Sequence, residues 1–476
     1  MIQTFEDKEL LNHRHGISGL HETVDAIAAD LDPQKLRILI VAEHASMRFG
    51  GEASLPLHYF RVLRQRGIET WLVVHERTRQ ELMAYFPEES DRIYFVSDSV
   101  WHKILYSTHQ YLPRKIFEIT LGFAMGMLTQ WHQRRLVKKL VKEQRIDVIH
   151  QPIYVSPKTP SLIFGMGAPV IMGPMNGGMS YPPGFQHMEN RFVRLSVHLG
   201  RLSSGLLNSL IPGKKLAATL LVANQRTREA LPPGTQGKVI ELVENGVDLS
   251  IWHHNADDRQ EKPNTLPTDS NHPSLTRFVF VGRLVDWKGV DLLLMAFKKV
   301  LEQVPAELEI IGEGSIRATL EQLAQGEMTP SLSHEAIPLH LKPDSVKFSG
   351  WLSPVECMQH LQRADVLVLP SLFESGGAVV LEAMSMGLPV IATQWGGPTD
   401  YINEQCGVLI PPISPEFFVN ELAAAMVKLA QSPKLRTQMG QVGRQRVLNC
   451  FDWEKKVDTI LDIYAETVNR TKVQNS

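Results

Sequence analysis

Short apolar runs alternate along the chain with longer stretches in which hydrophobic residues recur at helical spacing. Apolar runs bounded by turn residues are typical of strands buried on both faces, and helical stretches between them are typical of a parallel sheet. In the first half, the pattern predicts a helix at 55–65 and strands at 36–42, 70–74, 92–96, 147–150, 170–173, 220–223 and 239–243. We therefore expect a doubly wound parallel sheet there.

The second half repeats the pattern after a polar connection. Residues 256–276 are rich in Asp, Asn, Pro and Ser, which indicates a flexible link between domains. Strands are expected at 278–281, 307–311, 346–349, 366–369, 390–392 and 408–410, helices at 289–304, 316–324, 354–363, 417–430 and 453–467, and a polar surface insertion at 326–343. Two Rossmann-like α/β domains would form an interdomain cleft, because ligands of such sheets bind at the carboxyl ends of the strands.

Composition narrows the functional class. The chain has 476 residues, 43% of them hydrophobic and 21% charged, which suits two globular domains. A net charge of −2 gives no reason to expect nucleic acid as a partner. Cys357, Cys406 and Cys450 show neither a CxxC pair nor metal-ligand spacing, which fits a reducing cytoplasm.

The chain ends and apolar stretches bear on location. The first residues are polar and mixed in charge, unlike a signal peptide. The longest apolar stretch, 121–128, is too short to span a bilayer. We therefore expect a cytoplasmic protein, either free or lying at the inner face of the cell membrane.

Two glutamates flank a glycine turn in the second half. Glu374 follows the strand at 366–369, and Glu382 lies about one turn into the next predicted helix. A strand, a glycine turn and a helix N-terminus together present backbone N–H groups to an anion. Carboxylates on both sides accept hydrogen bonds from hydroxyls, so the segment suits a nucleotide sugar, with phosphate in the middle and hydroxyls at both ends. An ordinary βα junction with two solvated acids is the alternative.

The same segment resembles the E-x7-E region of family 4 of the retaining GT-B glycosyltransferases. The resemblance implies that Glu374 approaches the donor sugar and that Glu382 binds the ribose hydroxyls. The amides that bind the distal phosphate would be those of Gly376, Gly377 and Ala378. Gly376 and Ala378 replace the family's usual Phe and Leu, so we expect a freer loop and a wider pocket.

The resemblance implies the GT-B plan for the whole chain, and it is stronger over 278–410 than over 36–243. An acceptor-side domain would span 1–245 and a nucleotide-sugar domain 246–454. The final helix, 455–476, would cross back to the first domain, as it does in the family.

Two cations follow the first strand of the second half. Arg283 and Lys288 lie on one loop, where they can converge on a diphosphate. Fixed cations there stabilise the charge that develops on the leaving nucleotide. The pair resembles the family's Gly-Arg…Lys-Gly segment, with two solvated cations as the alternative. The only Asp-x-Asp, Asp30-Leu-Asp32, fits a turn or helix cap, so we expect no metal requirement.

Glycines and a histidine at strand ends are further candidates. Gly50 and Gly51 follow the first strand, would let the backbone approach a ligand closely, and resemble the family's glycine loop. Gly312 begins a Gly-x-Gly that lies near the nucleotide in the family. His150 resembles a family histidine that contacts the donor sugar. A structural histidine is the alternative, and His44 is the reserve candidate.

Three other features carry weaker signals. Trp351 follows the strand after which the base docks in the family, and we expect it to pack rather than stack. The stretch 173–184 resembles an acceptor-side Gly-Pro…Gly-Gly loop, with a long irregular linker as the alternative. Residues 101–146 hold nine Lys or Arg against two acids around an apolar middle. Such a stretch suits an anionic membrane surface, or a core-packed helix with a solvated basic end.

We therefore expect a hexosyltransferase that uses a nucleotide sugar and a saccharide or lipid-linked acceptor, in polysaccharide or glycoconjugate biosynthesis. Retention at the anomeric carbon and a front-face mechanism come from the resemblance alone. A UDP-sugar is favoured over a GDP-sugar, and no further cofactor is expected. A sugar-phosphate synthase, a nucleotide-sugar epimerase and a non-catalytic sugar-nucleotide binding protein are the alternatives.

Overall fold

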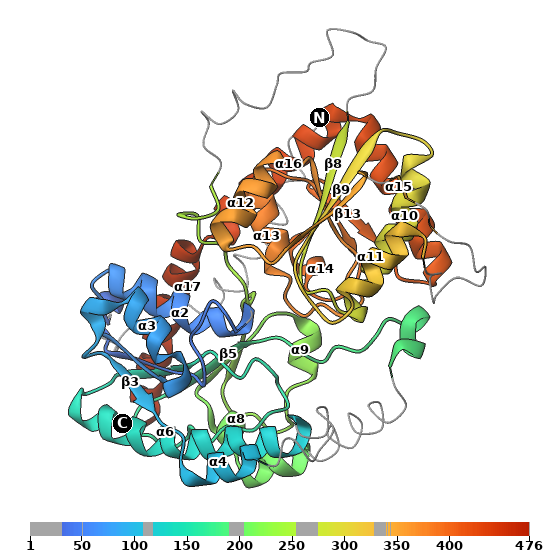
Figure 1. Ribbon diagram of the computed structural model, residues 1–476. Coiled ribbons are helices and arrows are strands. Elements are labelled where there is room, and N and C mark those ends of the chain that lie inside the picture. Colours follow the sequence, from blue (N-terminus) through green and yellow to red (C-terminus); the bar gives the residue numbers. More distant parts are fainter. Residues whose placement is uncertain are drawn as a thin grey trace.

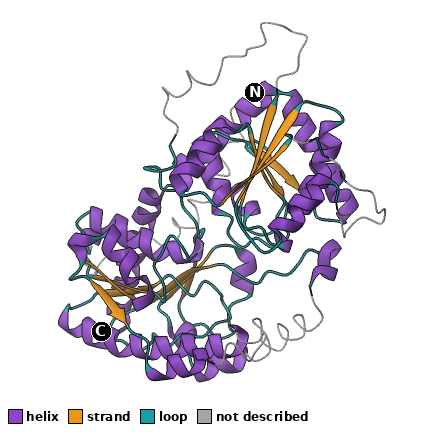
Figure 2. Cartoon of the chain, viewed as in Figure 1, coloured by secondary structure: helices purple, strands orange, loops and turns teal. Residues whose placement is uncertain are grey.

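Two parallel β-sheets, each covered by helices, divide the chain into two lobes (Figure 1). The computed structural model describes residues 31–49, 51–107, 118–189, 204–253, 275–327, 339, 341–342 and 344–475. The link expected at 256–276 and the insertion expected at 326–343 lie largely outside these residues. Helices flank both faces of each sheet (Figure 2), which is the layering expected of doubly wound α/β domains.

The first sheet has seven strands in the order β3-β2-β1-β4-β5-β6-β7. Its strands are β1 (Ile38–Val41), β2 (Thr70–His75), β3 (Ile93–Val96), β4 (Val148–Gln151), β5 (Val170–Met175), β6 (Thr219–Val222) and β7 (Lys238–Glu241). β1 pairs in parallel with both β2 and β4, so the strand order reverses around it. Loops after such central strands form the ligand-binding crevice of open sheets.

The second sheet has six strands in the order β10-β9-β8-β11-β12-β13. Its strands are β8 (Thr276–Val281), β9 (Ala306–Ile311), β10 (Val346–Gly350), β11 (Val366–Leu369), β12 (Val390–Thr393) and β13 (Gly407–Ile410). β8 and β11 pair in parallel at the centre. Every strand expected from the apolar pattern is confirmed to within two residues at each end.

Helices connect the strands in both lobes. Those of the first half include η1 (Pro33–Lys35), α2 (Gly51–Gln65), η2 (Glu76–Thr78), α3 (Arg79–Tyr85), η3 (Pro87–Glu89), α4 (Val100–Ser107), η5 (Glu118–Gly122), α6 (Phe123–Glu143), η6 (Pro183–Met188), α8 (Gly213–Leu216) and α9 (Gln225–Glu229). Those of the second half are η8 (Asp286–Lys288), α10 (Val290–Leu301), α11 (Arg317–Gln325), α12 (Pro354–Arg363), α13 (Ala378–Ser385), α14 (Pro398–Tyr401), α15 (Pro415–Gln431), α16 (Pro433–Cys450) and α17 (Trp453–Asn475).

Local chemistry explains some helix ends better than others. α12 begins at the predicted residue because Ser353 and Glu356 form a reciprocal capping box and Pro354 occupies the first turn. α2 begins at Gly51, four residues before the expected start. α16 was not predicted, because it buries few residues and its apolar contrast is weak.

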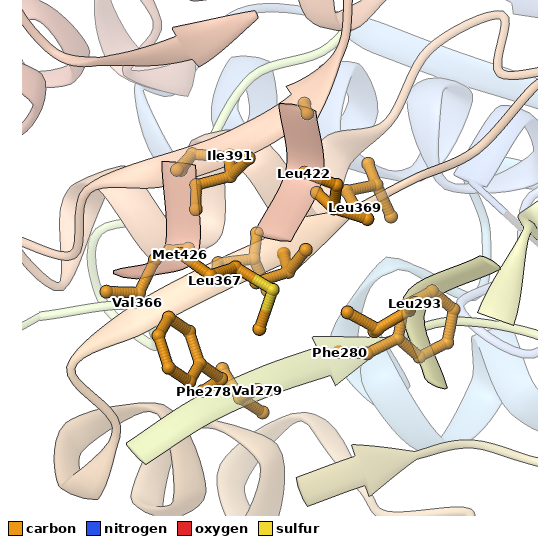
Figure 3. Close-up of a cluster of buried hydrophobic side chains, with 14 of the residues drawn as sticks. Phe278, Val279, Phe280, Leu293, Val366, Leu367, Leu369, Ile391, Leu422 and Met426 are labelled. Atoms are coloured by element: carbon orange, nitrogen blue, oxygen red, sulfur yellow. The ribbon is translucent and has the colours of Figure 1, made fainter. Parts of the chain in front are cut away.

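One apolar core fills the second lobe. Figure 3 shows Phe278 and Phe280 of β8 beside Leu367 of β11 and Met426 of α15. Fully burying a side chain of this size contributes about 1.5–3 kcal/mol. The first sheet has a separate cluster of buried side chains on each of its faces. Each lobe therefore has its own core.

The last helix returns to the first lobe. α17, red in Figure 1, packs against α2. Its Val457, Ile460 and Tyr464 are buried in the core of the first lobe. Just before α17, Val247 and Asp452 form a parallel bridge. The chain therefore passes between the lobes twice at neighbouring positions.

Candidate functional site

A cleft of about 440 Å³ lies between the two lobes. Its walls include the loop after β1, the turn after β7, and the loops after β8 and β11. A larger hollow of about 1030 Å³ borders Asp147, Gly237 and Arg470, beside the amino ends of strands of the first sheet. Because ligands of parallel sheets bind at the carboxyl ends, the smaller interlobe cleft is the candidate site.

Lys288 and Glu374 form an ion pair in the cleft. Lys288 ends η8 after β8, and Glu374 follows β11, so two central strands deliver the pair. Both side chains are largely buried, with 16% and 13% of their surface exposed. Lys288 therefore meets a carboxylate within the protein, close to the predicted phosphate loop.

Gly377 allows that loop to turn into α13. It adopts a φ of +77°, and a Cβ there would lie 3.2 Å from Glu374 Cγ. This left-handed residue lets α13 begin at Ala378, with its first N–H groups free of partners within the helix. Gly376, Gly377 and Ala378 all line the cleft, so the turn and helix N-terminus predicted from the sequence lie there together.

The expected widening beside Gly376 does not occur. A Cβ at Gly376 would lie only 2.5 Å from Asn245 Nδ2 and 3.5 Å from Glu244 Oε1. The side chains of the turn after β7 occupy the room that a larger residue at this position would need. Asn245 is itself held by a 3.0 Å hydrogen bond from Nδ2 to Tyr401 Oη.

Glu382 lies one turn into α13, as expected, and lines the cleft near Trp351 and Cys357. Burial raises the pKa of Glu382 to about 7. A carboxyl group in such surroundings is stabilised by hydrogen bonds that it accepts from, or donates to, ligand hydroxyls. Trp351 is 71% exposed at this edge of the cleft, so it does not pack against the protein as expected.

Arg283 and Gly312 are two predicted residues outside the lining of the cleft. The side chain of Arg283 is exposed on the loop after β8 that also carries Lys288. Gly312 has a φ of +141°, and a Cβ there would lie 1.9 Å from the carbonyl oxygen of Gly282. Gly312 thus permits close backbone packing beneath Gly282, which lines the cleft in its place.

The first lobe contributes fewer of the predicted contacts. Gly51 lines the cleft at the start of α2, whereas Gly50 lies outside the described residues. Asp32 caps η1 by accepting a 3.0 Å hydrogen bond from Gln34 N, which confirms the capping alternative for the Asp-x-Asp match. His44 is not among the residues that line the cleft.

His150 does not face the cleft. It is fully buried, its Nε2 lies 2.6 Å from the carbonyl oxygen of Gly173, and its Nδ1 lies 2.6 Å from Tyr464 Oη. Burial lowers the pKa of His150 to about 4, so the ring is neutral. Both ring nitrogens are used within the protein, which corrects the predicted sugar contact in favour of the structural alternative.

Sequence reasoning missed several polar residues of the cleft, among them Glu244 and His58. Glu244, in the turn after β7, is 2% exposed, and its Oε2 has no hydrogen-bond partner among the described residues. Burial, followed by the nearby Glu52, raises the pKa of Glu244 to about 8. His58 of α2 stacks on Trp453 at 4.8 Å between ring centroids. The signal for Glu244 was its place directly after a strand at the predicted domain boundary.

The stretch 173–184 touches the second lobe. Asn176 Nδ2 donates to the carbonyl oxygen of Ser375 at 2.6 Å. Trp395 Nε1 donates to the carbonyl oxygen of Ser180 at 2.8 Å. This stretch therefore braces the loop that carries Glu374 rather than serving as a linker.

One group of described residues has metal-ligand spacing: His75, Asp98 and His102. His75 Nδ1 accepts the backbone N–H of Arg77 at 3.2 Å, and His102 Nδ1 accepts that of Ser99 at 3.0 Å. Neutral rings with these acceptors carry their proton on Nε2. His75 Nε2 lies 3.2 Å from Asp98 Oδ1, but the two atoms form no hydrogen bond.

Residues 264–446 match the family described as "Glycosyl transferases group 1". A glycogen synthase from Mycobacterium tuberculosis is 29% identical over 243 residues, or 51% of each chain, so this chain spans about half the length of that curated relative. Sucrose-phosphate synthase from Thermosynechococcus elongatus superposes with a TM-score of 0.60 at 18% identity, covering 92% of this chain and 100% of that one. Anabaena HepE, solved in complex with UDP, superposes with a TM-score of 0.58 at 15% identity. The superposition covers 90% of this chain and 100% of that one. The fold is the GT-B fold.

Proposed function

We propose that this protein, a GT-B chain whose second half matches the group 1 glycosyltransferases, transfers a hexosyl unit from a nucleotide sugar. The observation that carries the proposal is the turn of Gly376, Gly377 and Ala378 at the start of α13, with Glu374 on one side and Glu382 on the other. The helix N-terminus suits a phosphate, and the carboxyl groups suit hydroxyls at the two ends of the ligand.

Lys288, the glycine turn, Glu382 and Glu374 each have a part in the proposed reaction. Lys288 would stabilise the negative charge that develops on the leaving diphosphate. The amides of the turn would hold the distal phosphate, Glu382 the ribose hydroxyls, and Glu374 the transferred sugar. We propose retention by a front-face path, in which the leaving phosphate takes the proton of the acceptor hydroxyl. Arg283, exposed outside the cleft lining, would have at most a peripheral part.

A UDP-sugar is the preferred donor in this proposal. Anabaena HepE, which shares the fold, was solved with UDP. The donor would be held chiefly by the second lobe, within 246–454, and the acceptor by the first lobe, within 1–245. A saccharide or a lipid-linked saccharide is the proposed acceptor, and polysaccharide or glycoconjugate biosynthesis the proposed context. With Lys288 and the helix N-terminus at the diphosphate, we propose that no metal is required.

Contact with a membrane is a second part of the proposal. Among the described residues, no helix is both long and apolar enough to cross a bilayer. Within 101–146, α6 packs Val137 and Leu140 into the core and exposes Arg135, Lys138 and Lys142, as in the core-packed alternative. α4, however, exposes Trp101 by 65% and Ile104 by 48%. An exposed apolar helix beside a basic one suits peripheral binding to an anionic membrane.

A donor panel tests the proposal. UDP-, GDP- and ADP-hexoses would be titrated against the protein by calorimetry and assayed for slow hydrolysis, with and without EDTA, and Glu374→Ala would serve as the site control. We expect a UDP-hexose to bind and EDTA to leave hydrolysis intact. No binding of any nucleotide sugar at millimolar concentration would overturn the function, and strict metal dependence would overturn the role given to Lys288.

The panel also separates the alternatives. Turnover with a soluble sugar phosphate as acceptor would identify a sugar-phosphate synthase, the activity named for one structure of the same fold. Interconversion of the donor's sugar without an acceptor would identify an epimerase. Binding without any turnover would identify a non-catalytic sugar-nucleotide binding protein.

A further inference from the structure

Glu244 is a buried carboxyl group for which the proposed reaction has no use. Its backbone is fixed, because Lys456 Nζ donates to the carbonyl oxygens of Val243, Glu244 and Asn245. Lys456 thus caps the turn rather than pairing with the carboxyl group. Among the described residues, Glu244 Oε2 has no hydrogen-bond partner, although the side chain borders the cleft.

A buried carboxyl oxygen without a partner is costly for a folded protein. Leaving such a group unsatisfied destabilises the folded state, because the group loses the hydration that it has in the unfolded chain. Polar groups of this kind persist where a ligand satisfies them, and they cluster at functional sites. The position of Glu244 in the cleft lining makes a ligand its natural partner.

The neighbours of Glu244 indicate which part of the ligand it meets. Its Oε1 lies 3.5 Å from the Cβ position of Gly376, on the turn that begins with Glu374. Burial first, and then the charges of Glu52 and Glu374, raise the pKa of Glu244, so both of these carboxylates lie near it. Glu244 therefore lies between the sugar end of the donor and the wall formed by the first lobe, away from the nucleotide.

We propose that Glu244 binds a hydroxyl group of the transferred sugar, opposite Glu374, and that it selects among donor sugars together with Gly376. The inference rests on the proposed function and deepens it. Burial favours the protonated form of Glu244 at neutral pH, and a protonated carboxyl group both donates and accepts hydrogen bonds. A site built to hydrogen-bond a substrate hydroxyl discriminates strongly against sugars that place that hydroxyl elsewhere.

The space beside Gly376 supports the pairing. Any side chain at position 376 would meet Asn245 and approach Glu244. In this chain position 376 is a glycine without a side chain, and the facing turn supplies the carboxyl group of Glu244. The sugar pocket would therefore be bordered here by a hydrogen-bonding group from the interlobe connection instead of by an apolar side chain of the donor loop.

The test compares a nucleotide with its sugar conjugates. Wild type, Glu244→Gln and Glu244→Leu would be titrated with UDP, UDP-glucose, UDP-galactose and UDP-N-acetylglucosamine, or with the same set on whichever base the donor panel selects. Glu241→Gln is the matched control, because Glu241 is an exposed glutamate at the end of β7. Circular dichroism and thermal unfolding would establish that each variant is folded.

We expect Glu244→Leu to weaken binding of the preferred sugar nucleotide by about 10-fold or more, and UDP itself by less than about 2-fold. Glu244→Gln should retain part of the affinity and change the order of preference among the three sugars. Glu241→Gln should match wild type. If the Leu variant does not fold, the sugar preference of the Gln variant decides.

Two results would overturn the inference. Equal weakening of UDP and its sugar conjugates would indicate a purely structural role for Glu244. Unchanged affinity and sugar preference in both variants would exclude contact with the donor sugar, including the case in which Glu244 meets only the acceptor. Failure of wild type to bind any nucleotide sugar would instead refute the proposed function.

Discussion

Lys288 and Glu374 hold each other beside the predicted phosphate site, so a change in either residue disturbs both. The pair is largely buried, which strengthens its electrostatic interaction relative to an ion pair in water. Arg283, which follows the same strand, is exposed and outside the cleft lining. Two cations with similar sequence signals therefore have different surroundings.

The first prediction follows from this difference. We expect Lys288→Ala to lower kcat by about 10²- to 10³-fold, the usual effect of removing one preorganised group that stabilises developing charge. Arg283→Ala should change kcat far less. Initial rates of donor hydrolysis and transfer at saturating donor would check this. Normal turnover by Lys288→Ala, or equal losses in the two variants, would contradict the role of Lys288.

The second prediction concerns Glu244 and pH. Burial first, then Glu52, raises the pKa of Glu244 from 4.5 to about 8 in the folded state. Between these values the folded protein keeps a proton that the unfolded chain has released, so this group makes stability fall as pH rises. We expect Glu244→Gln to raise the melting temperature more at pH 8 than at pH 5.

Comparing wild type with Glu244→Gln isolates the contribution of Glu244 to the pH dependence of stability from the contributions of its charged neighbours. Glu52, Glu374, Arg226 and Lys456 all interact with it, and the pKa of Lys456 is lowered by burial to about 7, which acts on stability in the opposite sense. These neighbours are common to both proteins. Thermal unfolding across pH 5–8 would measure the difference, and a gain that is independent of pH would contradict a raised pKa.

At the scale of elements, the start of α13 depends on a turn in the other half of the chain. The contact between Gly376 and Asn245 couples the donor loop to the interlobe turn. Asn245 is also bonded to Tyr401 of α14, so it cannot move aside without losing that hydrogen bond. The donor loop is therefore shaped from outside as well as by its own glycines.

The third prediction tests this coupling with a double-mutant cycle. Gly376→Ala should destabilise the protein by about 1 kcal/mol, because the new methyl group displaces Asn245 from Tyr401. In an Asn245→Ala background the same substitution should cost much less, since the opposing amide is gone. Chemical denaturation would measure the free energy of unfolding of wild type, the two single variants and the double variant. Additive changes in that free energy would show that the contact between Gly376 and Asn245 is unimportant.

The fourth prediction concerns α4 as a membrane contact. We expect binding to vesicles that contain phosphatidylglycerol, less to neutral vesicles, and weakening as salt rises, because basic residues near an anionic surface contribute about 1 kcal/mol each. Trp101→Ala with Ile104→Ser should reduce binding several-fold. Tyr85→Ala, an exposed aromatic on α3, is the control. Sedimentation with vesicles measures binding. Equal binding by wild type, the α4 double variant and Tyr85→Ala would argue against α4 as the membrane contact.

At the scale of the whole molecule, α17 ties the two lobes together. It begins beside the cleft with Trp453, which stacks on His58, and continues into the core of the first lobe. Tyr464 of α17 also bonds His150, which explains why that histidine is buried rather than catalytic. The end of the chain thus completes the lobe that its beginning forms.

The fifth prediction follows from this arrangement. Ile460→Ala should lower the free energy of unfolding by about 2–5 kcal/mol, because the residue is fully buried in the first lobe. Asp462→Ala, on the exposed side of α17, should change it by less than about 0.5 kcal/mol. Denaturant unfolding followed by circular dichroism would check both. Similar small effects would show that α17 contributes little to the first lobe.

The sequence by itself determined the elements and one side of the candidate site. All the expected strands formed, because each is a continuous apolar run whose burial on both faces follows from local composition. Glu374, the glycine turn and Glu382 could be brought together from the sequence because they belong to a single βα junction.

Only the tertiary structure decided which residues from distant segments meet them. Asn245 fills the space beside Gly376, α17 buries His150, and Arg283 is exposed whereas Lys288 is largely buried. Glu244 is a hydrophilic turn residue in the sequence and a buried carboxyl group in the fold, with no hydrogen-bond partner for Oε2 among the described residues. These outcomes depend on burial and on contacts between remote parts of the chain, and local residue patterns specify neither.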